Sequence, residues 1–285
     1  MNAAIDLLAG PPELPAPARA PGLGESIGLL ALYFALQLAV GFALALLVGL
    51  VVGLRVGLAG GGDAQQALRA AMGGPDLRTA ITAATLLVVA SVTLWIVHRR
   101  WPRQWSLPQA WQGFGFAPSQ RGAYYAVALA VGVGVPVIGG MLTHLLAGQH
   151  PVTQNIAQMG HSASLLARVV LAFTAVTLGP LVEETLFRGV LFSSLLGFRR
   201  GGPAGSPVGN TRLSMALVLS SVAFGMVHLP DLGWHWYAVP NLALLGLGCA
   251  WLRLKSGSLW PAVVAHGVNN LLAVAGWFVM MQPPG

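Results

Sequence analysis

The chain has 285 residues, of which only 8% are charged while 55% are hydrophobic, and its mean hydropathy is +0.71. Soluble domains average about 25% charged residues, so this composition excludes a soluble enzyme and indicates a membrane protein. The net charge of +7 does not indicate nucleic-acid binding, because the basic residues lie singly or in pairs between apolar runs.

Residues 1–26 form a tail that is rich in Pro and Ala. The tail has no basic start followed by an apolar core, so it predicts no cleavable signal peptide. The single cysteine, Cys249, excludes a disulfide within the chain and leaves the redox compartment open.

Seven apolar stretches follow, each close to the roughly 20 residues that a helix needs to cross a bilayer. They predict an all-α fold, a polytopic integral membrane helix bundle with about seven transmembrane helices, the number lying between six and eight. The stretches cover 27–54, 79–97, 122–147, 165–198, 213–229, 234–252 and 259–281.

Three regions are expected along the chain: the tail, N-terminal transmembrane helices with an interfacial aromatic segment over 27–120, and a catalytic core over 121–285. The aromatic segment, 101–118, mixes Trp and Phe with polar residues and Pro. Two interpretations fit it equally well, a segment lying along the cytoplasmic membrane interface and a loop packed on the bundle.

Arginines alternate between the loops from the second loop onward, which predicts a cytoplasmic N-terminus and an outer C-terminus. The first loop, with Arg55, Arg69 and Arg78, is assigned to the outer side and does not fit. A re-entrant or shifted first helix would remove this conflict.

Glu183 and Glu184 are the only acidic residues inside the apolar stretches. Ionisable groups at that depth are costly and usually functional. Glu184 and Arg188 are four residues apart, so they can pair on one helix face. This leaves Glu183 as the carboxylate without a charged partner, which suits a general base.

His228 and His266 lie in two other apolar stretches, and Asn270 follows His266 by one helical turn. At 1.5 Å per residue, Glu183 and His228 each lie about 24 Å from the Arg at the cytoplasmic end of their helix, and His266 lies about 16 Å from Lys255. The three helices therefore bring polar groups to similar depths. A purely structural role for four such groups would place costly side chains in three helices without a gain, although the Glu184–Arg188 pair alone suits a structural role equally well.

Three patterns, Glu183-Glu184-x-x-x-Arg188, Phe224-x-x-x-His228 and His266-x-x-x-Asn270, stand in this order on separate apolar stretches. Together they resemble the signature motifs of the CPBP intramembrane proteases, which include the type II CAAX prenyl endopeptidases and the abortive-infection or bacteriocin-immunity proteins. The resemblance covers about residues 165–275.

The resemblance implies that Glu183, assisted by His228, activates a water that attacks a peptide carbonyl without a covalent intermediate. It implies that His266 and Asn270 stabilise the oxyanion and that the Glu184–Arg188 pair orients the helix. No cofactor and no metal is expected. A zinc ion held by Glu183, His228 and His266 remains the alternative, although the chain has no His-Glu-x-x-His helix and a zinc-bound Glu183 would leave the reaction without its base.

The predicted function is hydrolysis of a peptide bond in a membrane-embedded or membrane-anchored protein or peptide, near the cytoplasmic leaflet or within the bilayer. The alternative is a non-proteolytic immunity or scaffold protein that uses the same polar cluster to bind a partner. A proton-coupled transporter is disfavoured, because the hydropathy pattern shows no internal repeat. Apart from the substrate, the lipid bilayer is the expected partner, and nucleic acid is not. The abundance of Gly, Ala and Arg with a single Lys favours a bacterial inner membrane as the location.

Overall fold

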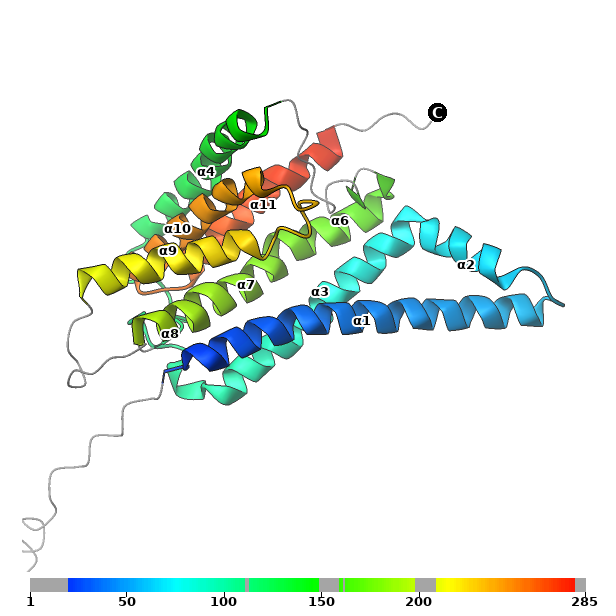
Figure 1. Ribbon diagram of the computed structural model, residues 1–285, viewed down its shortest axis with the longest axis horizontal. Helices are drawn as coiled ribbons and strands as arrows, with labels where there is room; N and C mark the ends of the chain where they lie inside the picture. Colours follow the sequence, from blue (N-terminus) through cyan, green and yellow to red (C-terminus); the bar gives the residue numbers. More distant parts are fainter. Residues whose placement is uncertain (1–19, 111–112, 149–158, 161, 198–208, 280–285) are drawn as a thin grey trace, which may run out of the picture.

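The fold is known from a computed structural model that describes residues 20–110, 113–148, 159–160, 162–197 and 209–279 (Figure 1). Within these ranges every regular element is a helix, which confirms the predicted all-α class. The longer helices are α1 (Leu23–Leu58), α3 (Pro75–Arg100), α4 (Ala123–Ala147), α9 (Asn210–Met226), α10 (Val239–Ser256) and α11 (Trp260–Val279).

One further membrane-length helix, over 165–197, is built from shorter pieces. These are α6 (Leu165–Phe173), a π-helical turn (Thr174–Leu178), α7 (Gly179–Glu184), a second π-helical turn (Thr185–Leu191) and α8 (Phe192–Gly197). Six helices in the described ranges are long and apolar enough to span a membrane. This number lies within the predicted range of six to eight. Helix α9, which corresponds to the predicted stretch 213–229, has 17 residues and reaches about 25 Å, less than the roughly 30 Å of a bilayer core.

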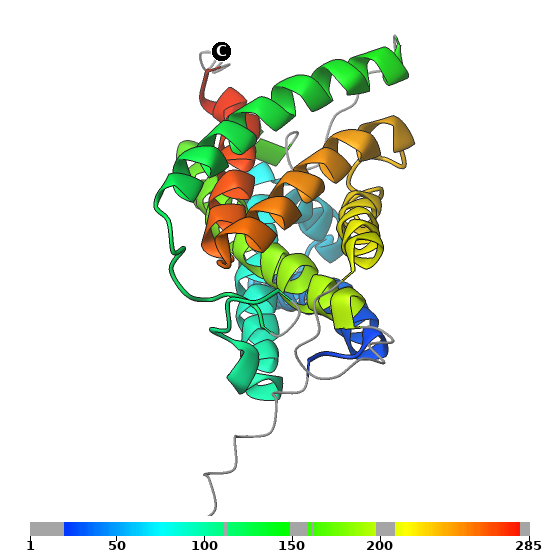
Figure 2. The same cartoon turned by 90° about the vertical axis from the view of Figure 1, so that its left-hand side faces the viewer.

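The helices form layers that are visible when Figures 1 and 2 are compared. Helix α4 lies outermost and packs on α10 and α11, which in turn pack on α9 and α7 respectively; α1 and α3 cover the opposite side. Helices α10 and α11 are therefore central, and the π-containing helix is held between them and the α1–α3 pair.

Helix α1 runs without interruption for 36 residues, so the re-entrant first helix considered above is wrong. After the turn at Gly60–Gly62 comes α2 (Ala64–Gly73), a short helix that the hydropathy pattern did not predict. Asp63 caps it, because its carboxylate accepts hydrogen bonds from the backbone N–H groups of Gln65 and Gln66.

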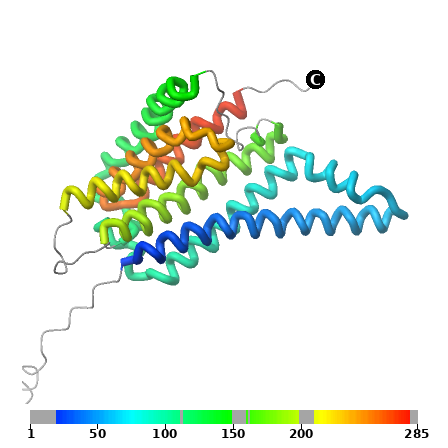
Figure 3. The backbone as a smooth tube through the Cα atoms, in the orientation of Figure 1, coloured from blue at the N-terminus to red at the C-terminus, as the bar shows by residue number. Residues whose placement is uncertain are grey.

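Contacts between helix ends define two ends of the bundle. At the first, the start of α1 meets the end of α3 through a Glu25–Arg100 ion pair of 2.7 Å, an approach that can be followed in Figure 3. We call this the basic end, since it also carries the basic residues Arg99, Arg103, Arg121, Arg212, Arg253 and Lys255. Arg199 and Arg200, which the topology prediction also used, lie outside the described residues.

At the opposite end, which we call the far end, the backbone N–H of Ser164 donates to Asp76 at 2.6 Å and the Arg168 guanidinium donates to the carbonyl of Trp277 at 2.8 Å. These bonds tie the starts of α3 and α6 and the end of α11 together. Arg55, Arg69 and Arg78 belong to this end, so the conflict noted for the first loop persists.

The aromatic segment packs on the basic end, as the second of the two interpretations expected. Trp101 and Phe114 are buried among the bundle helices. Trp105 stacks on Phe116 with ring centroids 3.8 Å apart, and Phe116 contacts Trp260 of α11 edge-on. Its contact with a membrane surface remains a prediction, and Trp111 lies outside the described residues, as do residues 1–19 of the tail.

Candidate active site

The two π-helical turns flank the Glu183–Glu184 pair and originate in the local sequence. Pro180 has no backbone N–H, and the N–H of Gly179 donates to Thr174, five residues back, as in a π-helix. In an α-helix the carbonyl of Ala175 would accept from the N–H of Gly179, and in a π-helix from residue 180. The first N–H is used by Thr174 and the second is missing in Pro180, so the Ala175 carbonyl has no backbone donor. Asn270 on α11 replaces these N–H groups, with its side-chain N–H donating to this carbonyl at 2.9 Å.

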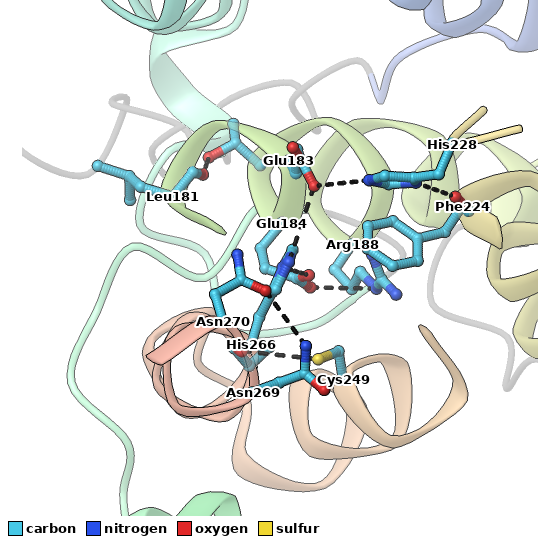
Figure 4. A network of polar contacts seen from close by, with 12 residues as sticks. Leu181, Glu183, Glu184, Arg188, Phe224, His228, Cys249, His266, Asn269 and Asn270 are labelled. Carbon is cyan, nitrogen blue, oxygen red and sulfur yellow. Dashed lines mark hydrogen bonds and ion pairs between the residues drawn. The ribbon is translucent and has the colours of Figure 1, made fainter. Parts of the chain in front are cut away.

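Glu183 lies between the two histidines of the signature patterns (Figure 4). Its Oε2 is 3.6 Å from Nε2 of His228 and 3.8 Å from Nε2 of His266. The carboxyl and the His228 ring are about one-fifth exposed, whereas His266 is nearly buried. Three side chains that are 38 to 83 residues apart in the sequence thus converge on one point.

The other ring nitrogen of each histidine is already engaged. Nδ1 of His228 lies 2.7 Å from the carbonyl of Phe224, and Nδ1 of His266 lies 2.9 Å from Oε1 of Glu184. Carbonyl and carboxylate oxygens only accept, so both Nδ1 atoms carry the hydrogen. Each Nε2 therefore faces Glu183, and in a neutral ring it is a hydrogen-bond acceptor. With both rings neutral, the two Nε2 atoms and the Glu183 carboxylate offer three acceptors to a small donor such as water.

Glu184 and Arg188 form an ion pair of 3.1 Å in which both side chains are completely buried. Glu184 also accepts from His266, so one carboxylate joins the pair to the imidazole of His266. The Arg188 guanidinium lies 4.4 Å from the ring centroid of Phe224, within cation–π distance. Arg188 thus contacts both α7, through Glu184, and α9, through Phe224.

Asn270 is fixed on both sides of its amide. Its Nδ2 donates to Ala175, and its Oδ1 accepts from Asn269 at 3.2 Å. One Nδ2 hydrogen remains for another acceptor, since an amide nitrogen carries two.

A prediction follows from this arrangement. Asn270→Ala should lower the free energy of unfolding by about 1–3 kcal/mol, because the buried carbonyl of Ala175 loses its donor. Adding Pro180→Ala restores a backbone N–H at the position that can serve this carbonyl, so the double variant should recover part of the loss. Thermal unfolding in lipid nanodiscs measures both. Equal melting temperatures for the single Asn270→Ala variant and the wild type would show that the hydrogen bond from Asn270 to Ala175 does not stabilise the fold.

Helix α1 contributes two polar cavity residues, Tyr33 and Gln37, that were not predicted from the sequence. A cavity of about 360 Å³ adjoins the site and is lined by Tyr33 and Gln37 of α1, Thr82 of α3, Asn269, and Asp231 after α9. Tyr33 and Gln37 are polar residues four apart in an apolar stretch, a spacing that could have indicated them. Desolvation raises the pKa of the Asp231 carboxyl, as does nearby Glu183, while His228 lowers it, although much of that side chain is exposed.

The zinc alternative is only partly matched by the geometry. Two imidazole nitrogens and a carboxylate are ligands that zinc accepts, and both histidines have the Nδ1 partners that orient metal ligands. Within the described ranges, however, no three His, Cys, Asp or Glu side chains are grouped closely enough to hold an ion.

Comparison with known proteins gives one match. Residues 165–272 match a family model described as "Type II CAAX prenyl endopeptidase Rce1-like". No curated protein and no solved structure matches the chain. The matched range contains all seven residues of the three signature patterns, and it ends within α11, two residues after Asn270.

Proposed function

We propose that the chain is an intramembrane endopeptidase of the CPBP type that hydrolyses a peptide bond of a membrane-associated protein or peptide. The match of residues 165–272 to the family model of type II CAAX prenyl endopeptidases supports this proposal. The convergence of Nε2 of His228, Nε2 of His266 and the Glu183 carboxylate at the cavity carries this proposal. Such a set of acceptors suits a water that must lose a proton as it attacks.

In the proposed reaction Glu183 accepts one proton of the water, while Nε2 of His228 holds the other by a hydrogen bond. The water oxygen bonds to the carbonyl carbon of the substrate, and the carbonyl oxygen becomes an oxyanion. Glu183 then gives the proton to the leaving nitrogen as the C–N bond breaks. The products are a carboxylic acid and an amine, and no covalent bond to the enzyme forms.

The oxyanion requires donors at fixed positions. The remaining Nδ2 hydrogen of Asn270 is one, because the bonds to Ala175 and Asn269 hold its amide in place. His266 donates from Nε2 only when its ring is protonated, since Nδ1 is committed to Glu184. The Glu184 carboxylate at 2.9 Å stabilises that protonated ring, and Arg188 balances the carboxylate when the ring is neutral. Glu184 and Arg188 are therefore positioning residues.

The proposal includes no metal, and removal of metal tests it. Purified protein in nanodiscs is expected to cut a quenched transmembrane peptide at the same rate before and after exhaustive treatment with a strong zinc chelator. Peptide cleavage is followed by fluorescence and the products by mass spectrometry. Loss of cleavage that added zinc restores would show that Glu183, His228 and His266 act as ligands.

The chain is an integral membrane protein with several apolar helices, and we place it in a bacterial inner membrane. If purified protein cuts no membrane peptide and Glu183→Gln leaves every cellular phenotype intact, the immunity or scaffold function replaces the protease function.

A further inference from the structure

The cavity extends from Glu183 toward the far end of the bundle. Its walls include Thr82, seven residues from the start of α3, and Trp277, two residues before the end of α11. Asp231 and Leu232 of the turn after α9 complete this part of the wall. Because α9 ends at Met226, this turn lies beside the site and leaves Asp231 exposed at the rim.

Toward the basic end the same site is closed by packed side chains. Phe187 and Phe224, which lie at the inner limit of the cavity, are 1% and 0% exposed. Behind them the aromatic segment crosses the helix ends, where the Ser193 hydroxyl donates to the carbonyl of Ala110 at 2.6 Å. The Ser258 hydroxyl donates to Ala117 at 2.6 Å, also across this end.

Arg253 of α10 also hydrogen-bonds to the aromatic segment. Its fully buried guanidinium donates to the carbonyls of Pro108 and Gly113, both at 2.7 Å. The backbone at Gly115 has φ +75°, and a Cβ there would lie 2.7 Å from the guanidinium carbon, so only glycine permits this close approach. The segment is thus a fixed cap on the basic end.

The two ends also differ in charge. Seven Lys or Arg residues of the described ranges lie at the basic end, against Arg55, Arg69, Arg78 and Arg168 at the far end. Arg168 is bound to the backbone carbonyls of Ala163 and Trp277. Short loops rich in Lys and Arg remain on the cytoplasmic side of a membrane, so the basic end faces the cytoplasm.

We infer that the cavity opens on the non-cytoplasmic face of the membrane and receives substrate segments presented from that side. The identification of the occupant as a substrate rests on the proposed function. The wall of the cavity contains the carboxylates of Glu183 and Asp231, and no Lys or Arg from the described ranges. Trp234 and Trp236, which are 72% and 62% exposed, follow Asp231 and suit the level of the lipid headgroups on this face.

An opening on the non-cytoplasmic face does not suit a scissile bond near the cytoplasmic leaflet, which was one of the two positions predicted from the sequence. A peptide bond in the cytoplasmic leaflet would have to pass the cap formed by the aromatic segment and the Phe187–Phe224 contact, whose ring centroids are 5.3 Å apart. The expected substrate is therefore a membrane-protein segment at or near the outer leaflet.

Single cysteines test the direction of the opening. The starting protein carries Cys249→Ala, which removes the one buried native thiol. Thr82→Cys and Ala273→Cys then place a thiol in the cavity wall from two helices. Gln120→Cys, at an exposed position of the basic end, is the matched control. Each variant is treated with a membrane-impermeant, positively charged methanethiosulfonate in spheroplasts and in inside-out vesicles.

We expect both cavity thiols to react in spheroplasts and to remain unlabelled in inside-out vesicles, with Gln120→Cys showing the reverse pattern. Cavity thiols that react only in inside-out vesicles, or from neither side, would overturn the inference. Labelling does not depend on hydrolysis, so its outcome is independent of the proposed function. A far-side opening in a protein that cuts no peptide would refute the protease function and leave the opening in place.

Discussion

Glu183→Gln is expected to reduce peptide cleavage by at least about 10²–10⁴-fold, the range that a positioned general base contributes. Glutamine has the shape of glutamate but does not accept a proton from water, so the change removes the base with little change in packing. Because the Glu183 side chain is partly exposed and has no Arg or Lys partner in the described structure, the variant should fold as well as the wild type. Initial rates on a quenched transmembrane peptide in nanodiscs measure the effect.

Glu25→Gln is the matched control for this variant. Glu25 is also a glutamate of the membrane bundle, but it pairs with Arg100 at the basic end, away from the cavity. It should retain the wild-type rate. Equal rates for wild type and Glu183→Gln, or equal losses in the two variants, would show that the carboxylate of Glu183 is not the base.

Arg188→Met is expected to have the largest effect on stability, lowering the free energy of unfolding by about 3–5 kcal/mol. The reason is that Glu184 is completely buried and would keep its charge without the guanidinium that balances it. Methionine fills much of the space against Phe224, so the loss reports the missing charge more than a cavity. Unfolding by a denaturing detergent, followed by tryptophan fluorescence, measures the change.

The double variant Glu184→Gln/Arg188→Met separates charge from packing. Removing both charges leaves a neutral amide that can still accept from His266, so the double variant should be more stable than Arg188→Met alone. If the two variants unfold at the same detergent concentration, the buried charge of Glu184 is not the cause of the loss.

The span pattern and the meeting of three helices could both be anticipated from the sequence, for one physical reason. In a chain with so few charges, polar residues in apolar stretches are conspicuous, and Glu183, His228 and His266 were singled out on that ground. Depth counted along each helix then predicted that they would lie at similar depths. The structure places Glu183 within 4 Å of both histidines, although their catalytic roles are proposals.

Features that depend on tertiary contacts could not be predicted from the positions of polar residues in the sequence. The π-helical turns around Pro180 depend on which backbone N–H groups are free and on the partner that Asn270 offers from another helix. The cap at the basic end depends on Arg253, which looked like a simple topology signal but is buried against two loop carbonyls. Helix α2 has too few apolar residues to stand out beside membrane spans.

Residues from α1 were missed because they carry no charge. Tyr33 is 3% exposed and lines the cavity with Glu183, although α1 lies outside the range that matches the family model. A search for ionisable side chains inside apolar stretches passes over a tyrosine or a glutamine. Only the packing of α1 against the π-containing helix shows that these side chains belong to the site.

The most direct test of the account compares the termini of membrane proteins, by mass spectrometry, in cells that contain either the wild type or Glu183→Gln at equal abundance. We expect at least one new terminus that is present only with the wild type, in a protein segment on the non-cytoplasmic side. Identical termini in the two strains, together with full rescue of a deletion phenotype by Glu183→Gln, would contradict it and leave the polar cluster a role in binding or assembly.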